Sequence, residues 1–589
     1  MKRNSLWTLL LLLVTLLVVL AAAGCGPAAT EEAAPPEEPA VEEAAPTEAP
    51  AEEVAEPEKE AVEPEVEEPA ADEPVILRVG VLTDLDCWNP FTCSSIWFQT
   101  RMAIEGLTGF GTTDSGCEGV PRLAESWEVS EDGLTWTVKL HEGITFSDGT
   151  PFDAEAAKWN LEWYANSESL WEWYAETWDL QSVEVIDDLT FSYTTADPIV
   201  NSPDYSWIWW SFLPPSVWGD VTEEEIYEFE NYPPVGTGPY VVTEHEPGSH
   251  IIFDAREDYY GGKPPIDRVV LSMYTNVDAI VSALLGGEID VTTHRMPPET
   301  YDTLAADPNI TVEETEPYAG VLHWLVFNRY EGGNKHPAID DPLVREAIDY
   351  AINKEQIVEV ALQGHGTVLP TGWIGKTDVE LNPEIEVTPY DPDMANQILD
   401  DAGYADTDGD GIRETPDGEP LEFRFIFQQE NPEALTITDL LSTWLEQVGI
   451  ALEPEALELG SWFPLVLDDH DYDLFLDSET HDIDAASMDF WFSCWSADSG
   501  SSALNYPGYC NPEMDDLVAA YWFNNDPEAR WEPMYEAQKI FADDRPLITL
   551  AGQNRIQAYR NDRFEFPKDT CDVSYGIFDP EGLMEAVVK

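Results

Sequence analysis

Residues 123–152 read LAESWEVSEDGLTWTVKLHEGITFSDGTPF. Polar and apolar residues alternate on both sides of Asp132-Gly133, which predicts two antiparallel strands joined by a tight turn. A second turn follows at 147–151, and the acidic start of the next segment predicts a helix over 153–164. This stretch therefore places a hairpin and a helix next to each other in the chain.

The same mixture of elements continues beyond this stretch. Apolar runs predict further strands at 75–81, 182–186, 189–195, 266–274, 321–328 and 421–427. An acidic helix is predicted near 222–230, and further helices are predicted near 276–286, 341–362, 391–402 and 434–448. Strands and helices that mix in this way are typical of α/β folds rather than of an all-β array or a solenoid.

The first 25 residues have the composition of an export signal. Lys2 and Arg3 precede an uncharged apolar run over 6–23, and small residues precede Cys25. The pattern resembles a bacterial lipoprotein signal, in which Cys25 becomes the lipid-bearing first residue of the mature chain. An uncleaved membrane anchor is the alternative, because the run of 18 residues is just long enough to span a bilayer. Both interpretations place the rest of the chain outside the cytoplasm.

Residues 26–74 are almost wholly Ala, Glu, Pro and Val, with 18 acidic residues and a single lysine. Such a segment cannot bury a core, so we expect a disordered acidic tether. The chain of 589 residues has a formal charge of −90, of which +2 lies in the leader, −17 in the tether and −75 in the remaining body. This charge argues against nucleic acid as a partner, since phosphates would be repelled.

Several motifs follow one another in order along the body. The first are the blocks inside 123–152, and the later ones are Val235–Tyr240, Tyr259–Asp267, Leu284–Asp290, Asp341–Ile348, Ala351–Lys354, Tyr472–Leu474 and Cys510–Asp515. Together these motifs resemble the extracellular solute-binding proteins of family 5, which are the peptide-, nickel- and oligosaccharide-capturing components of ABC importers. The resemblance implies an α/β, periplasmic-binding-protein-like fold of two hinged lobes, with an extra subdomain inserted in the first lobe. By resemblance, lobe I comprises 75–114, 233–320 and 555–589, its insert is 115–232, and lobe II is 321–554.

The resemblance also implies the function. We expect a lipid-anchored, monomeric protein that captures a small solute between its lobes and delivers it to the permease subunits of an ABC importer. Oligopeptide is the first ligand class, oligosaccharide is the second because aromatic rings suit sugar faces, and a chelated metal is the third. A secreted hydrolase and a sensory or adhesive surface lipoprotein are the alternatives from other classes. The sequence has no G-x-S-x-G, Walker-type or H-E-x-x-H motif, so we expect no enzyme and no required cofactor.

Two groups of aromatic and polar residues are candidates for ligand contact. Trp324 and Asn328 belong to the apolar strand 321–328, which is expected to line the cleft and to offer backbone groups to an extended peptide. Trp491 and Trp495 lie in the segment that usually faces the ligand in this family. Core packing is the alternative for each tryptophan.

Two acidic residues are candidates to anchor the amino terminus of a peptide. Peptide binders of this family often have an aspartate after a stretch that begins with Tyr-Asp, and here Tyr472-Asp473 leads to Asp482 and Asp484. The Gly-Trp that is expected between them is absent. Loop acids without a ligand are the alternative.

The run 406–417 reads DTDGDGIRETPD and resembles an EF-hand calcium loop. Its carboxylates occupy loop positions 1, 3, 5, 9 and 12, a backbone carbonyl would come from position 7, and glycine at position 6 allows the sharp turn. The predicted ligands are Asp406, Asp408, Asp410, Ile412, Glu414 and Asp417. A strand rather than a helix is predicted to follow, so a solvated acidic turn is the alternative to structural calcium.

Six cysteines remain when Cys25 is set aside, an even number that favours disulfides in an exported protein. Cys494 and Cys510 are close in sequence and far from the others, so we expect them to pair. The sequence does not assign partners among Cys87, Cys93, Cys117 and Cys571.

Overall fold

The structure is a computed structural model, and it describes residues 73–85, 88–91, 101–113, 116–167, 180–199, 203, 206–292, 295–315, 321–372, 381–429, 431–479, 488–498, 505–524, 526, 529–567 and 580–589. The leader and tether, with Cys25, lie outside these ranges. So do Cys87, Cys93 and Cys571, and nothing is described of the side chain of Cys117. No helix in the described part of the chain is long and apolar enough to cross a membrane.

The stretch 123–152 forms the predicted hairpin, which belongs to a four-stranded antiparallel sheet. In spatial order its strands are β4 (Ala124–Val129), β5 (Thr135–Leu140), β7 (Thr190–Thr195) and β6 (Leu180–Asp187). Helix α3 (Ala154–Asn166) begins where the sequence predicts, because the side chain of Asp153 accepts a hydrogen bond from the Ala156 amide at 3.0 Å. Val138 and Phe191 are fully buried in the core that this sheet shares with α3.

A second sheet and a two-stranded ribbon combine strands that are distant in the sequence. The sheet has the order β1 (Ile76–Val81), β10 (Arg268–Met273), β9 (His250–Ala255) and β8 (Tyr240–Glu246), with β1 parallel to β10 and the other pairs antiparallel. The ribbon pairs β11 (Ile310–Thr315) with antiparallel β18 (Arg555–Arg560). Helix α7 (Val277–Gly286) ends at Gly287, whose φ of 73° is the left-handed conformation that glycine adopts readily.

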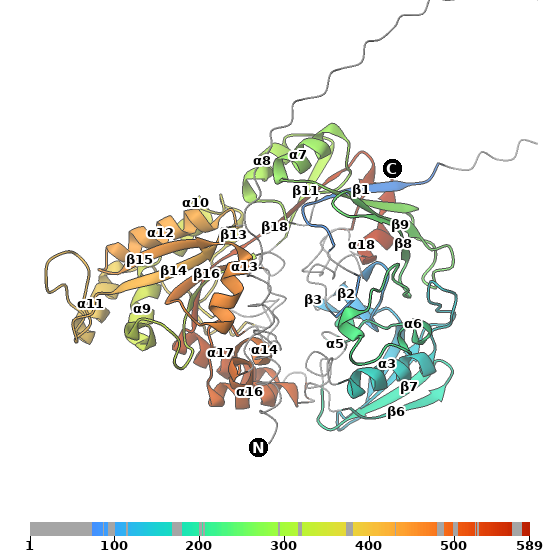
Figure 1. Cartoon of the computed structure of the whole chain (residues 1–589), viewed down its shortest axis with the longest axis horizontal. Helices are drawn as coiled ribbons and strands as arrows, with labels where there is room; N and C mark the ends of the chain where they lie inside the picture. Colours follow the sequence, from blue (N-terminus) through green and yellow to red (C-terminus); the bar gives the residue numbers. More distant parts are fainter. Residues whose placement is uncertain are drawn as a thin grey trace, which may run out of the picture. The chain divides into compact units, whose positions relative to one another are not determined.

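The largest sheet has six strands and is mixed (Figure 1). In spatial order these are β13 (Gly366–Thr367), β17 (Leu547–Gln553), β12 (Val321–Phe327), β16 (Leu474–Glu479), β14 (Glu422–Gln428) and β15 (Ala451–Leu457). β12 is central, and antiparallel strands pair with it on both sides. Its side chains alternate between two cores, with Leu325 in one and Trp324 in the other.

Helices cover both faces of the six-stranded sheet, which gives three layers. The core that contains Leu325 is completed by α9 (Pro342–Ala351), α10 (Lys354–Val360), α11 (Pro392–Ala402) and α12 (Ala434–Glu446). The core that contains Trp324 is completed by α13 (Leu459–Phe463), α14 (Met488–Phe492), α16 (Pro512–Trp522) and α17 (Trp531–Asp544). This is the layering expected of an α/β fold.

Two helix predictions differ from the structure. The acidic helix predicted at 222–230 is wrong, since only the 3-10 turn η1 (Ile226–Glu228) forms there. Glutamates at 223, 224, 225, 228 and 230 repel one another at helical spacing, and Ile226 is the only residue of η1 that is buried. The single helix predicted at 341–362 is two helices, α9 and α10, because Asn353 caps the second with its side chain.

A buried ion pair fixes the junction of these two helices. Nζ of Lys354 lies 3.0 Å from Oδ1 of Asp349, and both side chains are almost wholly buried. Oδ2 of Asp349 accepts hydrogen bonds from the hydroxyls of Thr371 at 2.8 Å and Thr388 at 2.7 Å, and Nε of Arg545 lies 3.3 Å away. Burial alone would raise the pKa of Asp349, but these partners together hold it below the ordinary value of 3.8.

Candidate ligand-binding site

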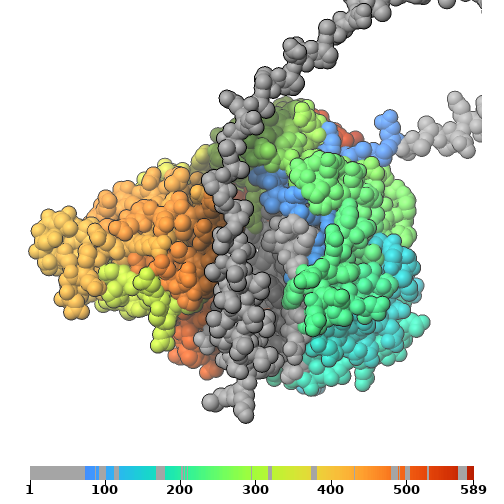
Figure 2. Space-filling view, viewed as in Figure 1, coloured from blue at the N-terminus to red at the C-terminus, as the bar shows by residue number. Residues whose placement is uncertain are grey.

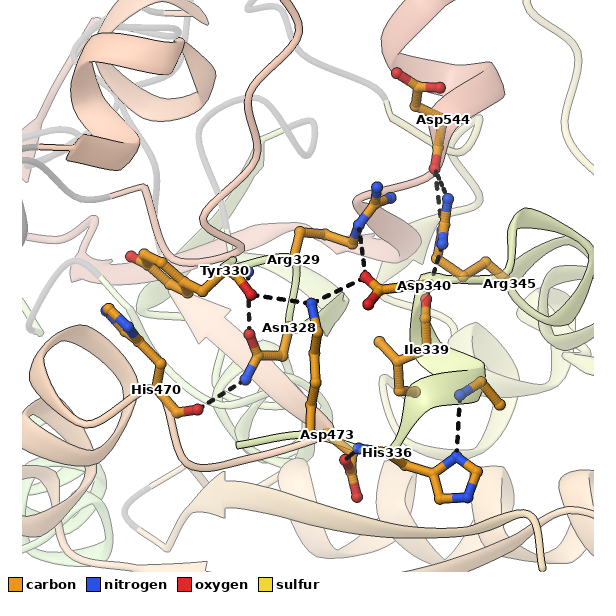
Figure 3. A network of polar contacts seen from close by, with 12 residues as sticks. Asn328, Arg329, Tyr330, His336, Ile339, Asp340, Arg345, His470, Asp473 and Asp544 are labelled. Atoms are coloured by element: carbon orange, nitrogen blue, oxygen red, sulfur yellow. Dashed lines mark hydrogen bonds and ion pairs between the residues drawn. The ribbon is translucent and has the colours of Figure 1, made fainter. Parts of the chain in front are cut away.

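The predicted ligand residue Asn328 lies just beyond β12 in a polar network that Figure 3 shows. Its Nδ2 donates hydrogen bonds to the carbonyl oxygens of His470 at 2.9 Å and Tyr472 at 2.8 Å, and its Oδ1 accepts one from the Tyr330 amide at 3.1 Å. The side chain is fully buried. Its visible role is to join the end of β12 to the segment before β16, and a role in ligand contact stays a prediction.

The network continues into the segment between Cys494 and Cys510. The ring of Tyr330 stacks on His470 with centroids 3.5 Å apart, and its hydroxyl donates to the Asn505 carbonyl at 2.7 Å. Burial raises the pKa of Tyr330 to about 12, so the hydroxyl stays protonated. The Asn505 amide in turn donates to the carbonyls of Ser493 and Tyr509. These contacts fix the segment that carries Trp491 and Trp495 against the end of β12.

The sulfur atoms of Cys494 and Cys510 lie 2.04 Å apart in the structure. This is the pairing that we expected from the sequence. Trp495 is in α15 (Cys494–Asp498) and is 39% exposed. Trp491 is in α14, partly buried, with its ring 5.8 Å from that of Tyr506. Trp495 is therefore accessible to solvent, whereas Trp491 is mainly a packing residue in this conformation.

Trp324 projects from the centre of β12 into the core shared with α14 and α17. Only 1% of it is exposed, and its cross-strand neighbours are Asp477 on β16 and Thr549 on β17. Phe492 packs against its ring at a centroid distance of 6.3 Å. The structure thus places Trp324 and Trp491 around one aromatic core, while Asn328 lies at the end of the strand.

The expectation that β12 offers its backbone to a peptide is wrong. Leu322 to Phe327 pair with β16, and Val321 to Val326 pair with β17. β12 has a neighbour along both sides, interrupted by a register shift at His323 and Trp324 on the β17 side, and strand addition requires an open edge. The sequence missed this because a central and an edge strand can have the same apolar run.

A buried polar group at the start of β12 was not predicted from the sequence. Nδ1 of His323 lies 2.9 Å from the Ser478 hydroxyl, and Nε2 lies 3.1 Å from Oε1 of Gln553. Burial lowers the pKa of His323 to about 4, so the imidazole is neutral at physiological pH. Such a histidine orients its neighbours without adding charge. The only sequence signal was a histidine inside an apolar strand.

The two acidic candidates Asp482 and Asp484 lie outside the described residues. Their role in anchoring a peptide stays a prediction.

The acidic loop 406–417 does bring four carboxylates together. One oxygen each of Asp406, Asp408, Asp410 and Glu414 lies within 4.8 Å of the others, and Asp417 is not in this group. Figures 1 and 2 show the loop, in yellow-orange after α11, at the surface of the protein.

The loop's backbone is already ordered by its own side chains. Asp406 accepts hydrogen bonds from the Gly409 amide at 2.6 Å and the Gly411 amide at 3.1 Å, and Glu414 accepts one from the Thr407 amide at 2.7 Å. The φ of 99° at Gly411 is the sharp turn that the motif predicted. Acidic turns of this kind occur with and without an ion, so calcium stays a prediction.

These features define a class of protein. The described residues combine a three-layer α/β unit, two four-stranded sheets, the two-stranded β11–β18 ribbon and aromatic side chains near the central strand β12. This is the α/β, periplasmic-binding-protein-like fold class that the sequence resemblance implied.

Comparison with known proteins identifies the family. Residues 118–501 match the bacterial extracellular solute-binding proteins, family 5. The chain belongs to this family and is therefore a substrate-binding protein of an ABC importer for peptides or related solutes, not an enzyme. Proteins of this family work with ABC permeases and act outside the cytoplasm.

Relatives of known ligand have diverse substrates. The chain is 25% identical to the glutathione-binding protein GsiB of Pectobacterium atrosepticum over 83% of this chain and 90% of that one. It is 27% identical to the oligopeptide-binding protein AppA of Bacillus subtilis over 74% of this chain and 78% of that one. The solved structure of a periplasmic oligopeptide-binding protein from Thermotoga maritima with mannohexaose has a TM-score of 0.74 at 22% identity, covering 88% of this chain and all of that one.

Proposed function

We propose that the protein captures oligopeptides and is anchored to the membrane by a lipid on Cys25. The observation that carries the peptide assignment is the likeness to AppA of Bacillus subtilis, whose solved structure contains a nonapeptide. The body carries a charge of −75, so it attracts peptides with basic residues over a distance of about one Debye length, ~8 Å at physiological salt. The proposed ligands are therefore peptides, and basic peptides are expected to associate with the protein faster than neutral or acidic ones.

An oligosaccharide is the second candidate. The protein from Thermotoga maritima was solved with mannohexaose although it is called oligopeptide-binding. Trp495 of this chain is accessible in the segment predicted to face the ligand, and a tryptophan ring is a suitable surface for a sugar.

The experiment has two stages. Mass spectrometry of the purified full chain, denatured in acid, identifies any solute that co-purifies. Thermal shift assays then compare trialanine, a lysine-containing tetrapeptide, a nonapeptide and mannohexaose. A ligand at 100 times its Kd stabilises the native state by about 2.7 kcal/mol, which is easily detected. A shift with mannohexaose and none with any peptide would refute the peptide assignment.

The lipid anchor is proposed from the sequence of the leader. The unchanged chain, expressed in bacteria, is expected in the detergent phase of a Triton X-114 extraction, and Cys25→Ala in the aqueous phase. Equal partitioning of the two would contradict lipidation. We also propose that the protein is a monomer. A molar mass of twice the chain mass, measured by light scattering on the Cys25→Ala protein, would contradict this proposal.

A further inference from the structure

The chain crosses between the six-stranded sheet and the β11–β18 ribbon at two places. The crossing from β11 to β12 includes 316–320, outside the described residues. The crossing from β17 to β18 consists of one residue, Asn554. Rotation of the sheet relative to the ribbon therefore requires a change in the backbone angles at or next to Asn554.

Asn554 is held through both its backbone and its side chain. Its amide N–H donates to the carbonyl oxygen of His365 at 3.0 Å. Its Nδ2 donates to Oε1 of Glu314 on β11 at 2.7 Å, and Nδ1 of His365 lies 3.0 Å from that same carboxylate oxygen. Residues from the ribbon, from the crossing and from the segment before β13 thus form a closed ring of three hydrogen bonds.

An aromatic contact supports this ring from the ribbon side. Tyr301 begins α8 (Tyr301–Ala305), the short helix that precedes β11. Its ring lies over the imidazole of His365, with centroids 4.4 Å apart and an angle of 33° between the planes. His365 therefore forms a hydrogen bond with Glu314 and packs on Tyr301, two residues on the ribbon side of the molecule. Its own backbone leads into β13 of the six-stranded sheet.

The chain adopts an unfavourable turn to place His365 there. Gln363 has a φ of 52° and Gly364 a φ of 88°. The left-handed region is rarely adopted by glutamine, and such residues mark places where the surrounding structure dictates the backbone. Gly366 follows, and a Cβ at this position would lie 2.7 Å from the Gly552 carbonyl oxygen. The turn brings His365 and the end of β17 into close contact.

The ring leaves one polar atom of the crossing unsatisfied. Oδ1 of Asn554 is out of contact with solvent and has no hydrogen-bond partner among the described residues. A buried acceptor without a partner is costly. The hydrogen bond from Nδ2 to Glu314 is thus the side-chain contact that offsets this cost in the observed orientation.

We propose that His365 is a positioning residue of the hinge: together with Glu314 and Tyr301 it forms a clasp that fixes the conformation of Asn554. The inference rests on the proposed function, because a hinge matters to a protein that closes around a solute. When the clasp opens, the backbone at the crossing is free to change its angles. When the clasp stays closed, it restricts the orientations of the six-stranded sheet relative to the ribbon from which a ligand can select.

Hydrogen–deuterium exchange of the purified full chain without added ligand tests the clasp. His365→Ala and Glu314→Ala are each expected to speed exchange in peptides covering 553–558 by about 5- to 10-fold, since each removes a hydrogen bond of ordinary strength. Glu314→Gln keeps the acceptor oxygen and is expected to remain within about twofold of the unchanged protein. His250→Ala is the matched control, because His250 also faces a glutamate, Glu244 at 3.4 Å, but lies on β9.

Faster exchange confined to the crossing and the ribbon, with rescue by Glu314→Gln, supports the clasp. Unchanged exchange at 553–558 in His365→Ala overturns it. So does an equal acceleration in His250→Ala, or an acceleration spread over all peptides, which would mean general destabilisation. His365→Phe keeps a ring against Tyr301 and is expected to give an intermediate rate. Because no ligand is added, a wrong ligand assignment would leave these results unaffected.

Discussion

Removal of the buried lysine at the junction of α9 and α10 tests the electrostatics of the six-stranded unit. Lys354→Met leaves Asp349 charged and buried, with two hydroxyl donors and Arg545 as its remaining partners. At the 3.0 Å separation of the pair and an effective dielectric constant of ~20, the lost attraction is about 5.5 kcal/mol. Breaking a buried pair usually costs about 3–5 kcal/mol of unfolding free energy. We expect a value near the lower end, because Arg545 remains.

Urea unfolding followed by tryptophan fluorescence measures this loss. The matched control is Lys139→Met, which removes a shorter ion pair, 2.6 Å from Glu125, between half-exposed side chains. No measurable change is expected there, since exposed pairs contribute little. The double variant Asp349→Asn with Lys354→Met should recover part of the loss, because the buried carboxylate is no longer charged.

The pH dependence gives the sign of the effect. The pKa of Asp349 is held below 3.8, so its contribution in the unchanged protein is present above that value and is lost as the pH falls through the folded-state pKa. In Lys354→Met, protonation relieves the buried charge, so the difference between the two proteins should narrow from pH 7 to pH 4. A cost no greater than that of Lys139→Met, or a difference independent of pH, would refute the reasoning.

Four further outcomes are expected. Millimolar calcium should raise the melting temperature of the unchanged protein and not that of Asp406→Asn with Glu414→Gln, and equal shifts would mean that the loop binds no calcium. Reduction, or Cys494→Ser with Cys510→Ser, should cost about 3 kcal/mol from the entropy of the closed loop, measured by urea unfolding, and no loss would argue against the bond. Trp495→Ala should weaken the co-purified ligand about tenfold or more in calorimetry without lowering the melting temperature, whereas an unchanged Kd would remove this residue from the site. The association rate of a lysine-containing peptide should fall several-fold between 50 and 500 mM NaCl in stopped-flow measurements, and a salt-independent rate would show that the acidic body does not steer ligands.

The parts of the fold that could be predicted from sequence are local. The hairpin at 124–140 follows from alternation and an Asp-Gly turn, and α3 follows from its cap at Asp153. The division of 341–362 was missed because Asn353 caps α10 within a continuous apolar pattern, and the cap is seen only in three dimensions.

The candidate site depends on contacts that are distant in sequence. His323 bonds to residues 155 and 230 positions later, so no pattern around it reveals the buried polar group. The same holds for β12, whose neighbours β16 and β17 decide that it is central and not an edge. Only the short-range pairing of Cys494 with Cys510 was accessible, because the separation is 16 residues.

The place of β17 in the six-stranded sheet has a consequence for biogenesis. β17 lies between β13 and β12, yet its residues, 547–553, are synthesised more than 200 positions after those of β12. Until β17 has been synthesised, β12 therefore lacks one of its two neighbouring strands and is exposed along that side. Pairing between strands more than 200 positions apart is slow to form. A chain truncated before residue 547 would leave β12 without its β17 partner and open to pairing with other chains, so quality control of this protein should depend on the synthesis of β17.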